Sequence, residues 1–175
     1  MGEVYERELK NILSGDEQAL LKMTRTGDED EKNGYLGLRD NPFLVIRAAG
    51  SLGVDLVALR WDFSFPIEVK SSRTDVLRFS SNPHLAEQAE RMSVDCSRSC
   101  LIPMYAFRLK SRKGDPWRIF SLPLEKDLEG RIGILQKKIP CIELNKNGNY
   151  IMRWEDGMKL SKFLTYLEYV SKTMK

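Results

Sequence analysis

The sequence has few of the residues that cross-link small secreted proteins or bind transition metals. It contains three cysteines and a single histidine in 175 residues. An odd number of cysteines does not make a disulfide framework, so we expect a reducing compartment. Cys96, Cys100 and Cys141, together with His84, lack the spacing of a common zinc site, and we interpret the cysteines as buried structural thiols. The single histidine also disfavours histidine-based nucleophilic catalysis.

Long apolar runs and a strong net charge are absent too. No apolar run approaches the roughly 20 residues that a membrane-spanning helix needs. The stretch MGEVYERELK mixes acidic and basic residues and does not have the form of a secretory signal, so we expect a cytoplasmic protein with no membrane partner. The net charge of +3 permits a nucleic-acid ligand without requiring one. The length and the 42% hydrophobic content suit one domain over residues 1–175.

Apolar periodicity and turn residues predict a chain in which helices and strands alternate. We expect helices over 3–14, over 83–97 and in the C-terminal DGMKLSKFLTYLEYVSKTMK. The expected strands are FLVIRAA, VDLVALR, FPIEVKSS, CLIPMYAFRLKS and PWRIFSLP. Residues 139–175 are expected to form a hairpin around Asn147-Gly148 and then the amphipathic helix, which could dock on the core or on a partner. This order of elements predicts an α/β domain with a mixed sheet.

Residues 14–41 stand out by their charge. They contain seven acidic and four basic side chains, a local charge of −3. We interpret this segment as an acidic insertion on the surface, in which QALLKM forms a helical turn or two. The alternatives are a solvated loop, a segment that repels DNA, a cap over a cleft and a surface for a partner protein.

Three charged residues interrupt two strands that otherwise look buried. Glu68 and Lys70 lie on one face of FPIEVKSS, because side chains alternate along a strand. An antiparallel neighbour would bring Asp55 level with Glu68, and two such carboxylates are suitable ligands for Mg²⁺ or Mn²⁺. With Lys70 beside them, the group would suit phosphodiester hydrolysis. The alternative is a surface Glu–Lys pair with Asp55 in a buried salt bridge to Lys70 or Arg47.

The first helix offers one more acid to this group. Glu6 and Glu8 lie on opposite borders of its apolar stripe, so either could face a cleft at the edge of the core. Helical periodicity leaves both open. The one that faces the cleft could complete a metal shell or help to deprotonate a water.

These residues resemble a known family. The spacing of Asp55 from IEVK is similar to the PD-(D/E)xK nuclease signature, and the wider context resembles the archaeal Holliday junction resolvases. The stretches that carry the resemblance are ERELKNIL, VIRAAGSLGVDLVAL, IEVKSSRTDVL, WRIF and GMKLSKFL. Among them, the stretch R-x-AGS-x-x-VDLVA is a more specific sign of this family than the acid–acid–lysine spacing alone.

The resemblance implies a restriction-endonuclease-like mixed β-sheet core flanked by helices, a homodimer, and Mg²⁺-dependent paired nicking of four-way DNA junctions in recombination and repair. It implies the following roles: Asp55, Glu68 and the Val69 carbonyl as metal ligands, Lys70 as the catalytic lysine, Glu6 as the essential helix acid, and Arg47 and Ser51 beside the scissile phosphate. Mn²⁺ is expected to substitute for Mg²⁺, and the protein to associate with the nucleoid when it is bound to DNA.

Basic residues beyond Lys70 are the remaining candidates for contacts with DNA. Arg73 and Arg78 follow the catalytic strand directly, and a second basic group comprises Arg108, Lys110, Arg112, Lys113 and Arg118. Two other functions use the same residues. One is a nuclease that acts on other branched or duplex DNA, and the other is a catalytically weak DNA-binding or partner-binding module on the same fold.

Overall fold

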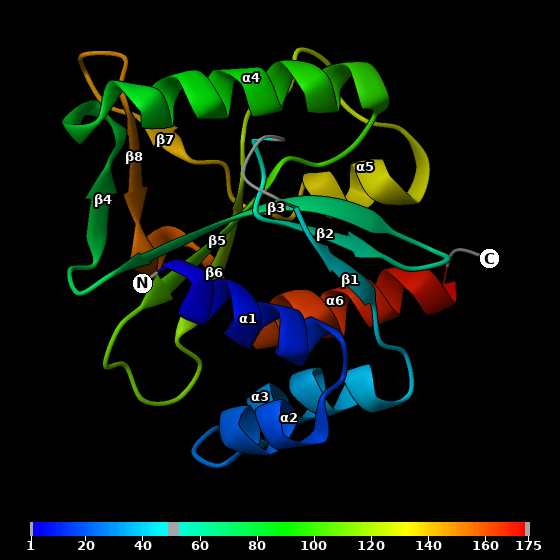
Figure 1. The fold of residues 1–175 in the computed structure, drawn as a ribbon. Helices are drawn as coiled ribbons and strands as arrows, with labels where there is room; N and C mark the ends of the chain where they lie inside the picture. The colour runs from blue at the N-terminus through cyan, green and yellow to red at the C-terminus, as the bar shows by residue number, and fades with distance from the viewer. Residues whose placement is uncertain (1, 49–52, 174–175) are drawn as a thin grey trace.

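A mixed β-sheet lies between two layers of other elements in the computed structural model, which describes residues 2–48 and 53–173 (Figure 1). The strands are β1 (Leu44–Arg47), β2 (Leu56–Leu59), β3 (Ser64–Ser72), β4 (Val76–Arg78), β5 (Met104–Leu109), β6 (Trp117–Ser121), β7 (Glu143–Leu144), β8 (Tyr150–Arg153) and β9 (Met158–Lys159). The helices are α1 (Gly2–Leu13), α2 (Glu17–Thr24), α3 (Glu29–Leu36), α4 (Pro83–Ser99), α5 (Gly130–Gln136) and α6 (Leu160–Thr173). The predicted fold class, an α/β domain with a mixed sheet flanked by helices, is confirmed.

The main sheet has six strands in the order β1-β2-β3-β5-β6-β9. Its first three strands form an antiparallel meander, and β5 then runs parallel to β3 because α4 provides the crossover between them. Leu56 lies opposite Ile67 in the antiparallel β2–β3 register, which brings the preceding residue, Asp55, level with Glu68, as expected for an antiparallel neighbour. A second, small sheet has the order β4-β8-β7 and contains the predicted C-terminal hairpin.

The two faces of the main sheet have separate cores. One core packs α1 and α6 against Ile67, Met104 and Ile119, and the other packs α4 and the small sheet against Tyr105 and Phe107. Figure 1 shows α4 above the sheet and α1 and α6 below it. The apolar stripe of α6 is buried in the first core, so this helix docks on its own domain.

The acidic segment differs from its predicted form. It folds into α2, α3 and a short 3₁₀ turn, and Leu20, Met23, Tyr35 and Leu38 are all buried in the first core. The Tyr35 hydroxyl donates to Asp115 (2.7 Å), and Asp115 also accepts from the first turn of α6. The helix expected at QALLKM is confirmed as α2, but the expectation of a surface excursion for the remainder was wrong, because α3 and the 3₁₀ turn bury Tyr35 and Leu38 in the core. Most charges of the segment face solvent.

The cysteines and the second basic group also differ in part from expectation. Cys96 is buried, and burial raises the pKa of its thiol to about 12, whereas Cys100 and Cys141 are exposed.

Arg118 is buried over the ring of Trp154 and donates to the carbonyls of Asp115 and Trp117. It is therefore an internal cation and not part of a surface track for DNA.

Candidate active site

The charged residues predicted from the sequence meet where β2 begins beside the middle of β3. The Asp55 N–H donates to the Ile67 carbonyl (3.0 Å), and the Asp55 carboxylate then accepts from the Val69 N–H (2.7 Å). A side chain thus takes the place that the next backbone carbonyl would have in the ladder. This hydrogen bond fixes one oxygen of Asp55 between the positions of Glu68 and Lys70.

Glu68 is the more buried of the two carboxylates, with 3% of its surface exposed. One of its oxygens accepts from the Lys70 ammonium group (2.5 Å). The other, Oε2, is buried and has no hydrogen-bond partner among the described residues. Since a buried unpartnered carboxylate oxygen is costly, this one is suited to a ligand that brings positive charge.

The electrostatics of the pair support the same interpretation. Burial raises the pKa of Asp55, and the nearby charge of Glu6 raises it further, although the Val69 N–H opposes the shift. Burial likewise raises the pKa of Glu68, and Asp55 adds to the rise, whereas Lys70 and the nearby Gln88 amide oppose it. Two acids that disfavour each other's ionised form are stabilised together when a cation binds between them.

Glu6 and Arg47 lie near enough to Asp55 for both of their charges to act on its carboxylate. Glu6 accepts from the Arg47 guanidinium at 2.8 Å, and Glu3 lies 3.6 Å from the same nitrogen. The Arg47 side chain is 35% exposed and that of Glu6 18%. The guanidinium therefore remains accessible to a phosphate, and Glu6 is the helix acid on the side of Asp55.

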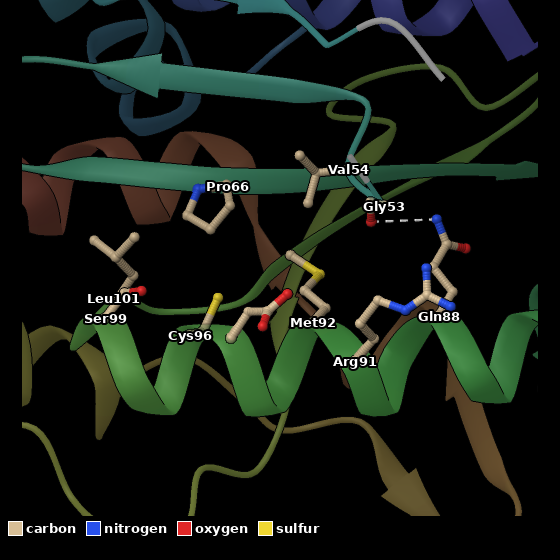
Figure 2. A pocket seen from close by; sticks show the side chains of 10 residues that line it. Gly53, Val54, Pro66, Gln88, Arg91, Met92, Cys96, Ser99 and Leu101 are labelled. Carbon is tan, nitrogen blue, oxygen red and sulfur yellow. Dashed lines mark hydrogen bonds between the residues drawn. The ribbon is translucent and has the colours of Figure 1, made fainter. Parts of the chain in front are cut away.

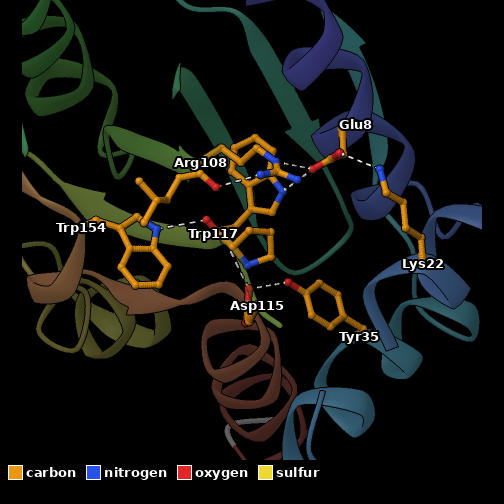
Figure 3. Close-up of polar contacts among 9 residues, drawn as sticks. Glu8, Lys22, Tyr35, Arg108, Asp115, Trp117 and Trp154 are labelled. Carbon is orange, nitrogen blue, oxygen red and sulfur yellow. Dashed lines mark hydrogen bonds and ion pairs between the residues drawn. The ribbon is translucent and has the colours of Figure 1, made fainter. Parts of the chain in front are cut away.

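Glu8, the other acid that periodicity allowed, faces a different part of the core (Figure 3). Its carboxylate accepts from Arg108 (2.8 Å), the Trp117 indole (3.0 Å) and Lys22 (3.1 Å). Although burial would raise the pKa of Glu8, the hydrogen bonds and charges of Arg108 and Lys22 hold it below its ordinary value. Glu8 thus ties α1 to α2 and the sheet, and Arg108 is occupied there rather than free for DNA.

A metal site would rest on few protein ligands. Within residues 2–48 and 53–173, no three His, Cys, Asp or Glu side chains are grouped closely enough to form one. The carboxylates of Asp55 and Glu68, with the Val69 carbonyl predicted beside them, are hard oxygen donors that fit Mg²⁺ or Mn²⁺. The unpartnered oxygen of Glu68 is the structural observation behind this fit.

Three predicted residues remain: Arg73, Arg78 and Ser51. Arg73 and Arg78 are exposed, in the turn after β3 and at the end of β4. Ser51 lies outside the described residues.

Two residues near the acids were missed in the sequence. The Gln88 amide on α4 donates to the Gly53 carbonyl (3.3 Å), just before Asp55, across a pocket of about 160 Å³ (Figure 2). Tyr105 lies beside Glu68 in the β3–β5 register, with a buried hydroxyl. An amide on a helix and an aromatic residue in a strand carry no chemical signal by themselves, so only the fold reveals their position.

The comparison with solved structures gave matches, whereas those with family models and curated sequences gave none. In fold the chain is similar to Hjc, a Holliday junction resolvase from the archaeal hyperthermophile Archaeoglobus fulgidus, with a TM-score of 0.47 and 19% sequence identity. The match covers 74% of this chain and 96% of the other. Among the described residues, no helix is long and apolar enough to cross a membrane.

Proposed function

We propose that this chain is a divalent-cation-dependent DNA endonuclease that resolves four-way junctions by paired nicking in recombination and repair. The observation that carries the proposal is the meeting of Asp55, Glu68 and Lys70 at one point of the sheet. One buried carboxylate oxygen there has no hydrogen-bond partner among the described residues. Carboxylates next to a lysine and an accessible arginine suit an enzyme that must bind and attack a phosphodiester.

Each side chain has a distinct task in this proposal. Asp55 and Glu68 hold Mg²⁺ or Mn²⁺, which when bound supplies a more acidic water and a contact for a phosphate oxygen. Lys70, held by Glu68 at 2.5 Å, would orient the attacking water and stabilise negative charge on the phosphate.

Arg47 and Glu6 would change partners on binding. A phosphate oxygen that accepts from the Arg47 guanidinium would replace Glu6, now 2.8 Å away. Glu6 would then be free to accept the proton of the attacking water. Arg73 and Arg78, both exposed, would contact the backbone of the DNA arms.

A homodimer would supply two such sites for two symmetric cuts. Sedimentation of the protein at micromolar concentration, with and without DNA, tests this. A species of twice 20.2 kDa is expected, and a monomer in both conditions would remove the geometric basis for paired nicking.

Cleavage of a matched four-way junction, flap and linear duplex in Mg²⁺ tests the choice of substrate. We expect symmetric nicks in the junction and little cutting of the duplex. Equal cleavage of all three would instead indicate a general nuclease with the same chemistry. Binding that persists in EDTA, without product after Mg²⁺ or Mn²⁺ is added, would indicate a catalytically weak binding module.

A further inference from the structure

Two buried side-chain oxygens have no hydrogen-bond partner in the described part of the chain, and they belong to residues directly opposite each other. They are Oε2 of Glu68 and the hydroxyl of Tyr105. Glu68 and Tyr105 are partners in the parallel β3–β5 register, so both side chains project from the same face of the sheet. Tyr105 is fully buried and Glu68 is 3% exposed.

The surroundings of Tyr105 give no structural reason for a hydroxyl. Its ring packs in an apolar cluster that includes Phe79, Phe107 and Phe120, with the Phe79 ring centroid 5.8 Å away. A phenylalanine would fill this position without burying an unpartnered polar group, which is unfavourable. The hydroxyl is therefore best explained by a partner that joins the site.

We propose that Tyr105 is a positioning residue: its hydroxyl donates to Oε2 of Glu68 through one ordered water and so orients that carboxylate toward a bound divalent cation. The inference rests on the function proposed above. Lys70 already holds Oε1, so Tyr105 would fix the second oxygen of the same carboxylate. Partners of this kind behind a metal ligand set its orientation and its affinity for the metal. The polar neighbours of such a water would be the Tyr105 hydroxyl and the Glu68 carboxylate, the lower end of the two to four that buried waters usually have.

The test compares the affinity of the full chain for Mn²⁺ in wild type, Tyr105→Phe and Glu68→Gln by isothermal titration calorimetry. Tyr150→Phe is the matched control, since Tyr150 also packs on Phe79 but is only half-buried. We expect Tyr105→Phe to bind Mn²⁺ about tenfold more weakly with an unchanged or higher Tm, and Tyr150→Phe to bind as wild type does. The kcat for junction nicking should fall in Tyr105→Phe, while KM for the junction stays the same.

The other outcomes are distinguishable. Unchanged affinity in Tyr105→Phe, with weak binding in Glu68→Gln, would overturn the role of Tyr105 and leave the metal site intact. Equal losses in Tyr105→Phe and Tyr150→Phe would overturn it as well, because the effect would not be specific to this hydroxyl. If wild type binds no Mn²⁺, or if wild type and Glu68→Gln bind Mn²⁺ with the same affinity, both the metal site and this inference are overturned.

Discussion

The carboxylate of Asp55 accepts a hydrogen bond from the backbone N–H of Val69 at 2.7 Å, between the two charged residues of β3. The bond joins the start of β2 to the centre of β3 through a side chain, where a regular ladder would use the backbone. Among the described residues, no hydrogen bond uses the second oxygen of Asp55, which lies level with Glu68. The hydrogen bond to Val69 thus has a structural role, and it also holds the carboxylate of Asp55 in a position where its other oxygen can bind a metal.

The two glutamates of α1 should separate activity from stability. Glu6→Gln should slow junction nicking about 10- to 100-fold, because it removes the acid beside Arg47. Its free energy of unfolding should change by no more than about 1 kcal/mol, since the ion pair is partly exposed. Nicking rates and urea denaturation measure the two effects.

Glu8→Gln is the matched variant on the same helix. It should lose about 1–3 kcal/mol of stability, because Arg108, Trp117 and Lys22 all donate to this carboxylate. The folded variant should nick at the wild-type rate. A fully stable Glu8→Gln that no longer nicks would show that the roles of the two acids have been exchanged.

The packing of the acidic segment on α6 predicts a strong effect at Gly34. An added Cβ would lie 2.3 Å from the Ser161 carbonyl oxygen, so Gly34→Ala should destabilise the protein by about 1–3 kcal/mol through overpacking. At Gly37 the nearest atom, on Glu168, would be 3.9 Å away, and the backbone is helical. Gly37→Ala should therefore be neutral or stabilising by up to about 1 kcal/mol. Equal Tm values for the two variants would mean that α3 does not pack on α6 in this way.

A buried ion pair should contribute to stability only above acidic pH. Asp62 has a fully buried side chain 2.6 Å from Arg60. Although burial would raise the pKa of Asp62, its hydrogen bonds with Arg60 lower it below the ordinary value. The folded state therefore binds this proton less readily than the unfolded state does. The stability gained is fully present above about pH 4, the ordinary pKa of an aspartate, and is lost as pH falls through the lowered value.

The pH dependence of Asp62→Asn measures this contribution. The difference in unfolding free energy between wild type and Asp62→Asn should be constant near neutral pH and shrink below about pH 4. Asp127→Asn, at an exposed position, is the control: its unfolding free energy should differ little from that of wild type at every pH. A difference between wild type and Asp62→Asn that grows on acidification would contradict the lowered pKa.

The sequence predicted those features that depend on local pattern. Alternation along FPIEVKSS placed Glu68 and Lys70 on one face, and strand pairing brought Asp55 beside them as expected. The periodic apolar residues of α6 are buried as their spacing predicted. In β3 and α6, the residue pattern therefore predicted which side of the element each of these side chains occupies in the fold.

Features that depend on distant partners were not predictable in this way. Arg118 looked like a surface cation because its acceptors and the Trp154 ring are assembled only by the fold. In the acidic segment, the charges outnumber the few apolar residues that bury it, so composition indicated a loop where Tyr35 anchors a helix to Asp115. The choice between Glu6 and Glu8 likewise depended on which sheet residues each one meets.

The most direct measurement compares wild type with Asp55→Asn on one fixed four-way junction in Mg²⁺, following binding and nicking in the same samples. Asparagine keeps an oxygen for the Val69 N–H but has no charge for the cation, so the fold and DNA binding should persist while nicking falls at least about 100-fold. Paired symmetric nicks by wild type, and bound but uncut junction with Asp55→Asn, are the predicted result. Equal nicking by both proteins would contradict a catalytic centre built on Asp55.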